Sequence, residues 1–283
     1  MLSKVYTLCK VFYLGENYNG SQRQPKLRTI EGELLNVLHQ KQYISDDLYK
    51  NQIIHSAGRT DTGVHARAMV YGFYNQREVF YPMEVNSVLA NDILIWSSCN
   101  VELVDDLPSV HPRYQALCRQ YKYFLVDSQQ QLQFPLVQST IEKLSGTHDF
   151  RNFSKLEMKT NTIRTVDSIA VEKNEYIWVF NFVAKSFLWN QIRKMMRVIT
   201  HIGKKEWSME VLDSLFDPKD RTVASKLEPM PPNGLILWDI FYPSYLEFRN
   251  CNRSVEKLKS LLMSWRDSLY TQESLLQRLH NSF

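Results

Sequence analysis

Apolar and polar residues alternate along several stretches of the chain, as they do in a β-strand that has one face in a protein core. The alternation is clear from Val5 to Phe12, and it returns in an aromatic segment where Tyr121, Tyr123 and Leu125 share one face. Apolar runs on both sides of Lys173-Asn174 predict a hairpin that turns there. Strands are therefore expected within residues 4–14, 66–75, 81–101, 119–126 and 168–187.

Other segments carry apolar residues every three or four positions, the spacing of a buried helical face. The clearest is residues 188–203, where Leu188, Ile192, Met195, Ile199 and Ile202 form one stripe and Gly203 ends it. Helices are also expected in 29–42, at the start of 81–101, and in 139–154, where Gly146 closes the helix.

The order of these elements repeats, which indicates an α+β fold of two similar halves that share one mainly antiparallel sheet. We expect the helices on one side of this sheet and a cleft between the halves. The expected units are residues 1–108, 109–245 and a charged, helical C-terminal extension, 246–283. In the extension, Ser274 and Gln277 predict a capping box for a last short helix.

The amino-acid composition limits the classes of function that we expect for this chain. With 44% apolar and 23% charged residues the chain is that of an ordinary globular protein, and its net charge of +4 permits a nucleic-acid partner without demanding one. The four cysteines lack metal-site spacing, and no membrane-spanning run or secretory signal is found, so we expect an intracellular, most directly cytoplasmic, protein without metal. Motifs for nucleotide hydrolysis, dinucleotide binding, zincins and serine hydrolases are missing.

One segment, "SAGRTDTGVHARA" (56–68), concentrates candidate chemistry around Asp61. Asp-Thr-Gly is the tripeptide of aspartic proteases, so a retroviral-type protease dyad is one interpretation. Against it, the chain holds no second Asp-Thr-Gly, and a neighbouring arginine favours an ionised carboxylate where the dyad needs a shared proton. A structural turn is a second interpretation, because Asp and Thr next to Gly often bond their own backbone.

The flanks of the tripeptide favour a third interpretation. "AGRTDTGVHA" resembles the signature loop of the tRNA pseudouridine synthase A (TruA) family, and further stretches resemble that family in the same order. Together they span residues 5–243. They are "YLGENYNGSQRQ", "VHPRYQALCRQYKYFLV", "GTHDFRNF", "FLWNQIRKMMRVITHIG", "DRTVAS" and "PPNGLILWDIFYP".

The resemblance implies the pseudouridine synthase fold and the isomerisation of uridine to pseudouridine without a cofactor. Asp61 matches the family's essential aspartate, as nucleophile or base beside the glycosidic carbon. Arg193 matches the arginine that pairs with it, and Tyr121 matches a tyrosine suited to stack on uracil and to assist proton transfer. Arg59 matches the arginine that helps draw the nucleotide out of the RNA stack.

RNA binding is expected from basic residues around the cleft, which would contact mostly phosphates and RNA shape. His65 is expected to hydrogen-bond within the loop. The basic candidates are Arg23, Lys26, Arg28, Arg67, Arg113, Lys122, Arg151 and Lys155.

The family's partners and targets are implied too: a homodimer, with the anticodon arm of tRNA as substrate and uridines 38 to 40 as targets. "HDFRNFSK" is closest to the archaeal and eukaryotic branch associated with positions 38 and 39. A non-catalytic tRNA-binding or chaperone protein of the same fold is the remaining alternative. The chain departs from the family at Ser21, where an aromatic residue is usual, at Thr62, and in the longer "KLEPMPPNGL".

Overall fold

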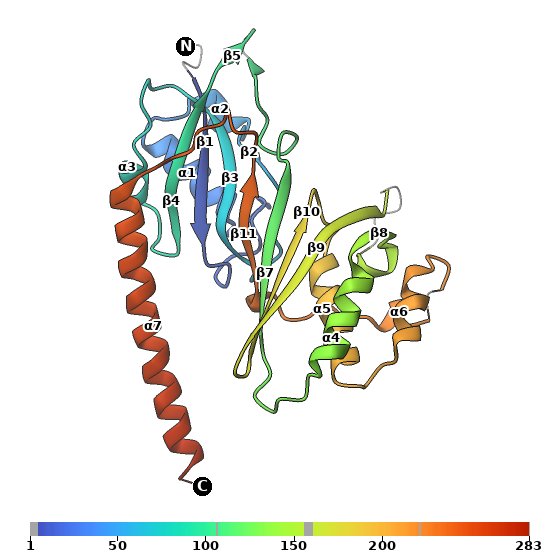
Figure 1. The fold of residues 1–283 in the computed structure, drawn as a ribbon. Helices are drawn as coiled ribbons and strands as arrows, with labels where there is room; N and C mark the ends of the chain where they lie inside the picture. The colour runs from blue at the N-terminus through green and yellow to red at the C-terminus, as the bar shows by residue number, and fades with distance from the viewer. Residues whose placement is uncertain (1–4, 106, 156–160, 221, 283) are drawn as a thin grey trace.

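The computed structural model describes residues 5–105, 107–155, 161–220 and 222–282, and its centre is one long twisted sheet (Figure 1). Along this sheet the strands follow the order β12-β4-β1-β3-β11-β7-β10-β9-β8, with β2 paired to β3 beside that path. Every pairing is antiparallel except β11 with β3. The sheet strands are β1 (Val5–Tyr13), β2 (His55–Ser56), β3 (His65–Asn75), β4 (Ile93–Val101), β7 (Cys118–Val126), β8 (Gly146–Asp149), β9 (Ile163–Asn174), β10 (Ile177–Ala184), β11 (Leu235–Phe241) and β12 (Arg249–Asn250); β5 (Leu103–Val104) and β6 (Leu107–Pro108) form a separate two-stranded ribbon.

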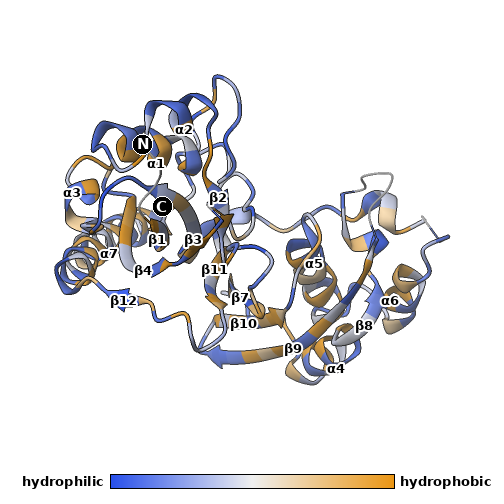
Figure 2. Cartoon of the chain, turned by 90° about the horizontal axis from the view of Figure 1, so that it is seen from above, coloured by the Kyte–Doolittle hydropathy of each residue, from blue (hydrophilic) through white to orange (hydrophobic). Residues whose placement is uncertain are grey.

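Helices flank the sheet in two groups, with α1, α2 and α3 beside the N-terminal strands and α4, α5 and α6 beside the later ones (Figure 1); Figure 2 shows the same two groups from above. The mainly antiparallel α+β architecture predicted from the periodicity is therefore confirmed. The α-helices are α1 (Ile30–Gln40), α2 (Asp46–Lys50), α3 (Pro82–Asn86), α4 (Phe134–Leu144), α5 (Gln191–Gly203), α6 (Met209–Phe216) and α7 (Asn252–His280); the 3-10 turns are η1 (Arg151–Phe153), η2 (Ala224–Lys226) and η3 (Pro232–Gly234).

Strand β11 joins the two groups of strands although it lies near the end of the chain. It runs parallel to β3, with Leu237 opposite Ala66, and antiparallel to β7, with Leu237 also opposite Tyr121. Leu235, Leu237 and Ile240 are buried, so β11 is anchored by apolar contact as well as by backbone bonds. This arrangement places the loop before β3, the strand β7 and helix α5 around one centre.

Most boundaries agree with the pattern along the chain. Helix α4 ends before Gly146, whose φ of +96° suits glycine, and the β9–β10 hairpin turns at Glu175-Tyr176, just past the predicted position. The capping box at Ser274 was a wrong prediction, because α7 continues through it as one helix to His280. Within the described ranges, no helix combines the length and the apolar character needed to span a bilayer.

Candidate active site

The loop that carries Asp61 is held by the segment between β1 and α1. The Ser21 hydroxyl accepts a hydrogen bond from the Thr60 amide at 2.8 Å, and the Ser21 amide donates to the Thr60 carbonyl at 3.1 Å. The buried Thr60 hydroxyl lies 2.7 Å from the Tyr13 hydroxyl. Ser21 therefore stabilises the Asp61 loop through two hydrogen bonds to Thr60. A bulky aromatic side chain here would lose the bond from Ser21 Oγ to the Thr60 amide.

Two glycines allow the backbone to pass this closely. A Cβ on Gly15 would lie 2.1 Å from the Val64 carbonyl oxygen, a distance that no side chain tolerates. Gly63 has a φ of +80°, and its amide donates to the Gly15 carbonyl at 3.2 Å. The turn closes with the Val64 amide donating to the Asp61 carbonyl. The Asp61 side chain is thus presented from a backbone that is fixed on both sides.

Helix α5 brings an arginine to Asp61. One terminal nitrogen of the Arg193 guanidinium donates to Asp61 Oδ2 at 3.1 Å, and the same nitrogen donates to Asn190 Oδ1 at 3.1 Å. The arginine side chain is 13% exposed and the aspartate 28%, so the pair is sheltered yet reachable. The buried face of α5 carries Ile192, Met195 and the apolar residues after them, which leaves Arg193 free to face the loop.

A backbone segment that the sequence analysis did not assign to the site completes this arrangement. The Met230 carbonyl accepts from Arg193 Nε at 2.7 Å, and the Pro231 carbonyl accepts from the Tyr123 hydroxyl at 3.0 Å. The Asn233 carbonyl lies 3.1 Å from His65 Nε2. The proline-rich stretch before β11 was the available signal, because prolines hold a chain extended and leave its carbonyls available to outside donors.

Tyr121 lies on β7 beside this centre. Its ring meets that of Phe187 edge to face, with centroids 5.5 Å apart. Burial raises the pKa of Tyr121 to about 12, while the charge of Arg119 lowers it and that of Asp61 raises it. The phenol therefore remains protonated at neutral pH and lies within electrostatic range of Asp61.

A second arginine close to the site, Arg119 on β7, was also missed by the sequence analysis. Its side chain is buried and donates hydrogen bonds to three backbone carbonyls, those of Ala57, Arg113 and Lys185. Ala57 lies four residues before Asp61, and Lys185 lies in the connection that leads to α5. The Arg119 guanidinium thus links two segments to β7: the one that leads to Asp61 and the one that leads to α5 and Arg193. The only sequence signal was an arginine two residues before the motif tyrosine.

The basic residues that were expected around the cleft lie in different parts of the structure. Arg59 is exposed next to the Asp61 loop, and both Arg59 and Arg23 act on Glu31, where burial raises the pKa and the two charges lower it. Arg23 also hydrogen-bonds Gln52. Arg113 is exposed, and its carbonyl accepts from Arg119.

Arg67 is not brought to Asp61. Its guanidinium lies over the rings of Trp96 and Trp238 and donates to Asp239 at 3.2 Å. The Lys122 ammonium lies over the same Trp238 ring at 4.4 Å. Since Lys122 follows Tyr121 directly in β7, their side chains point to opposite faces of the sheet. Both cations therefore belong to the face that Tyr121 does not share.

His65 acts as a hydrogen-bonding link at the start of β3. Its Nδ1 accepts from the Gly15 amide at 3.1 Å, so the proton is on Nε2, which donates to the Asn233 carbonyl. Burial is the main influence on His65 and lowers its pKa below the usual range, against opposing effects of Glu16 and the Asn233 carbonyl. The folded protein therefore favours the neutral ring.

A pH dependence of stability follows from this. A histidine whose pKa is lowered by folding contributes stability above its unfolded pKa of about 6.5, and that contribution is lost as the pH falls towards the folded value. We expect the melting temperature to fall between pH 7 and pH 5, and to fall less in His65→Gln, which is insensitive to protonation. Burial also lowers the pKa of His55 and of His111, so these residues contribute to the same fall in melting temperature. The effect of His65 is therefore measured as the difference between the wild-type and variant curves. Parallel curves for the two proteins would contradict the role of His65.

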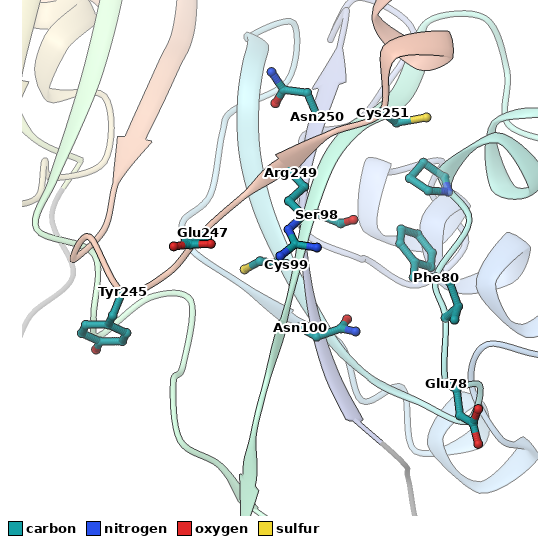
Figure 3. Close-up of a pocket in the computed structure, with 12 residues that line it drawn as sticks. Glu78, Phe80, Ser98, Cys99, Asn100, Tyr245, Glu247, Arg249, Asn250 and Cys251 are labelled. Atoms are coloured by element: carbon teal, nitrogen blue, oxygen red, sulfur yellow. The ribbon is translucent and has the colours of Figure 1, made fainter.

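A separate hollow of about 580 Å³ lies beside the paired strands β12 and β4. It is lined by Ser98, Cys99 and Asn100 of β4, by residues of the segment from Tyr245 to Cys251, and by residues of segment 78–82 that include Glu78 and Phe80 (Figure 3). Asp61, Tyr121 and Arg193 are not among its lining residues. The candidate site is therefore defined by the converging side chains rather than by this hollow.

Comparisons with known proteins are consistent among themselves. Residues 140–243 match a family model described as "tRNA pseudouridine synthase". Proteins named tRNA pseudouridine synthase A are similar over most of the chain: 34% identity in Methanobrevibacter smithii over 97% of both chains, 33% in Methanosphaera stadtmanae over 89% of both, and 33% in Archaeoglobus fulgidus over 89% of this chain and 88% of that one. Among solved structures, an archaeal box H/ACA sRNP Nop10-Cbf5 complex superposes at a TM-score of 0.33 with 11% identity, covering 69% of this chain and 43% of that chain.

Proposed function

We propose that this chain, which belongs to the tRNA pseudouridine synthase A family, isomerises uridine to pseudouridine in tRNA. The observation that carries the proposal is the contact between Asp61 and Arg193, which come from distant parts of the chain and meet at 3.1 Å beside Tyr121. The family consists of isomerases, and an aspartic protease is not favoured, because a carboxylate bound to a guanidinium is unsuited to a proton-sharing dyad.

The reaction breaks the N1–C1′ bond of uridine and forms a C5–C1′ bond, after which C5 releases its proton and N1 gains one. In our proposal Asp61 is the group that acts at the glycosidic carbon, as nucleophile or base. Arg193 orients its carboxylate through a charge-assisted hydrogen bond, with Asn190 and the Met230 carbonyl fixing the guanidinium. Tyr121, kept protonated by burial, stacks on the base and assists the proton transfer at C5.

The same proposal gives the surrounding residues their roles. Arg59 enters the space that the flipped nucleotide vacates, and Arg23 and Arg113 contact phosphates. His65 binds the loop to the segment before β11 and takes no part in the proton transfer. We assign Arg67 a structural role on the sheet face opposite Tyr121, because its partners are Trp96, Trp238 and Asp239. No cofactor is required by this chemistry.

Several finer statements are part of the proposal. Residues 1–108 and 109–245 act as two halves with the RNA-binding cleft between them, and residues 246–283 form an extension. The substrate is the anticodon arm, with uridines at tRNA positions 38 to 40 as targets and 38 and 39 favoured by "HDFRNFSK". The enzyme works as a homodimer, inside the cell and most directly in the cytoplasm.

Tritium release from tRNA tests the proposal. Unmodified tRNA transcripts whose uridines carry tritium at C5 are incubated with the full chain, and one tritium should enter water for each pseudouridine formed. Mapping the modified positions then identifies the target uridines. Binding of tRNA without release from any transcript would favour the non-catalytic alternative, and cleavage of peptides in place of release would favour the protease.

A further inference from the structure

An exposed tryptophan lies beside the Asp61–Arg193 pair and has no role in the proposed mechanism. Trp189 is 48% exposed, although burial of its large indole ring would stabilise the fold. It directly precedes Asn190, whose Oδ1 accepts a hydrogen bond from the same Arg193 nitrogen that contacts Asp61 Oδ2. A wide apolar ring is therefore held at the surface next to the residues that fix the carboxylate of Asp61.

The turn that carries Trp189 is fixed by hydrogen bonds. The Leu188 amide donates to Gln191 Oε1 at 2.8 Å, and the Gln191 amide donates back to the Leu188 carbonyl at 3.1 Å. Gln191 is fully buried, and Asn190 has a φ of +65°, a left-handed conformation that few residues other than glycine adopt. Because the backbone on both sides of Trp189 is fixed, little conformational entropy is lost when a ligand contacts the ring.

A lysine accompanies this ring. The Lys155 ammonium lies 4.6 Å from the centroid of the Trp189 ring, and the Lys155 amide donates to the Trp189 carbonyl at 3.2 Å. The Lys194 ammonium of α5 donates to the Ser154 carbonyl at 3.4 Å, so the segment that carries Lys155 is bound to the same helix. The side chain of Lys155 is exposed. An aromatic surface with a cation beside it is the combination with which proteins bind an unpaired base and its phosphate.

We propose that Trp189 stacks on an unpaired base of tRNA next to the target uridine and that Lys155 contacts the phosphate of that nucleotide; this inference rests on the proposed function. A neighbouring base is favoured over the target itself, because Tyr121 is the ring assigned to the uracil. Single-stranded RNA is recognised largely by bases that stack on aromatic side chains, and such stacking tolerates any base. Trp189 then adds affinity without reading sequence, which suits an enzyme whose proposed targets lie at several positions.

Filter binding of unmodified tRNA to two variants tests the stacking contact. Trp189→Leu should raise the dissociation constant about 5- to 30-fold, and Trp189→Phe should stay within about 3-fold of wild type because phenylalanine still stacks. In Trp189→Leu the KM should rise with the dissociation constant while kcat changes less than about 3-fold, since the ring touches no reacting atom. Tyr245 is 66% exposed beside the separate hollow, so Tyr245→Leu is the matched control and should bind as wild type does. Equal dissociation constants for Trp189→Leu and wild type would overturn the proposal.

Salt dependence separates the role of Lys155 from that of the ring. Lys155→Met should lower the slope of log dissociation constant against log salt concentration by about 1, as expected for the loss of one phosphate contact. Trp189→Leu should leave the slope unchanged, because the indole carries no charge. A wild-type slope in Lys155→Met would overturn the phosphate contact and would show that the ammonium only packs on the ring.

Transcripts with a single abasic residue, placed at successive positions of the anticodon loop, identify the base that stacks. Removing that base should weaken binding to wild type about as much as Trp189→Leu does, and it should have no further effect on Trp189→Leu itself. If wild type binds tRNA and releases tritium but no position shows this coupling, the stacking inference alone is overturned. A wild type that neither binds tRNA nor releases tritium overturns the proposed function and this inference together.

Discussion

Replacing Asp61 by asparagine is expected to lower tritium release from tRNA by at least about 10³-fold while leaving tRNA binding within about 3-fold of wild type. The amide has the shape of the carboxylate and can still accept a bond from Arg193, so the loop keeps its geometry. What it lacks is the negative charge needed to act on the glycosidic carbon. Single-turnover tritium release measures the chemical step, and filter binding measures the affinity.

The neighbouring residue supplies a matched control for this experiment. Thr62 is exposed in the same loop, and Thr62→Ala should leave both release and affinity near wild type. The melting temperatures of the Asp61 and Thr62 variants should agree, because the loop is held mainly by Thr60, Ser21 and Tyr13. Retention of more than a tenth of the wild-type release by Asp61→Asn would show that Asp61 is not the reacting group.

The fold was largely predictable because the apolar periods are long and regular. The stripe of α5 and the aromatic alternation of β7 specify their elements locally. The position of β11 between β3 and β7 was not predictable in this way, since strand order depends on contacts between residues more than a hundred positions apart. The continuous helix α7 shows a different limit, because a capping signal at Ser274 is too weak to end a helix that is rich in leucine.

The site was predictable only where side chains carry the signal. Asp61, Tyr121 and Arg193 were found by resemblance to a family, and the structure brings Arg193 to Asp61. The carbonyls of Met230 and Asn233 were not found, because a backbone acceptor has no side-chain motif and the prolines around it are only an indirect signal. Arg67 was expected among the basic residues around the cleft, and its partners in the structure are Trp96, Trp238 and Asp239. In a strand, however, neighbouring side chains point to opposite faces, and only the pairing of strands decides which face a residue joins.

Arg119 is the residue for which we expect a loss of activity without a role in the chemistry. Arg119→Met leaves the carbonyls of Ala57, Arg113 and Lys185 without their donor, which destabilises the fold by on the order of 3 kcal/mol. The same loss frees the Asp61 loop to shift relative to α5. A displacement of about 1 Å is sufficient to lower the rate about 100-fold. We therefore expect kcat to fall about 100-fold and KM for tRNA to change less than about 3-fold.

The measurement must separate misplacement from unfolding. Steady-state tritium release is compared at a temperature where circular dichroism shows both proteins folded, so that kcat refers to native molecules. Arg119→Lys keeps a charged donor and should recover part of the rate, because an ammonium can still reach some of the three carbonyls. Arg197→Met is the matched control, since that arginine lies one turn after Arg193 on α5 and, among the described hydrogen bonds, its side chain donates to a single carbonyl, that of Glu228. If Arg119→Met melts earlier but keeps its kcat per folded molecule, the guanidinium stabilises the fold and does not position Asp61 against Arg193.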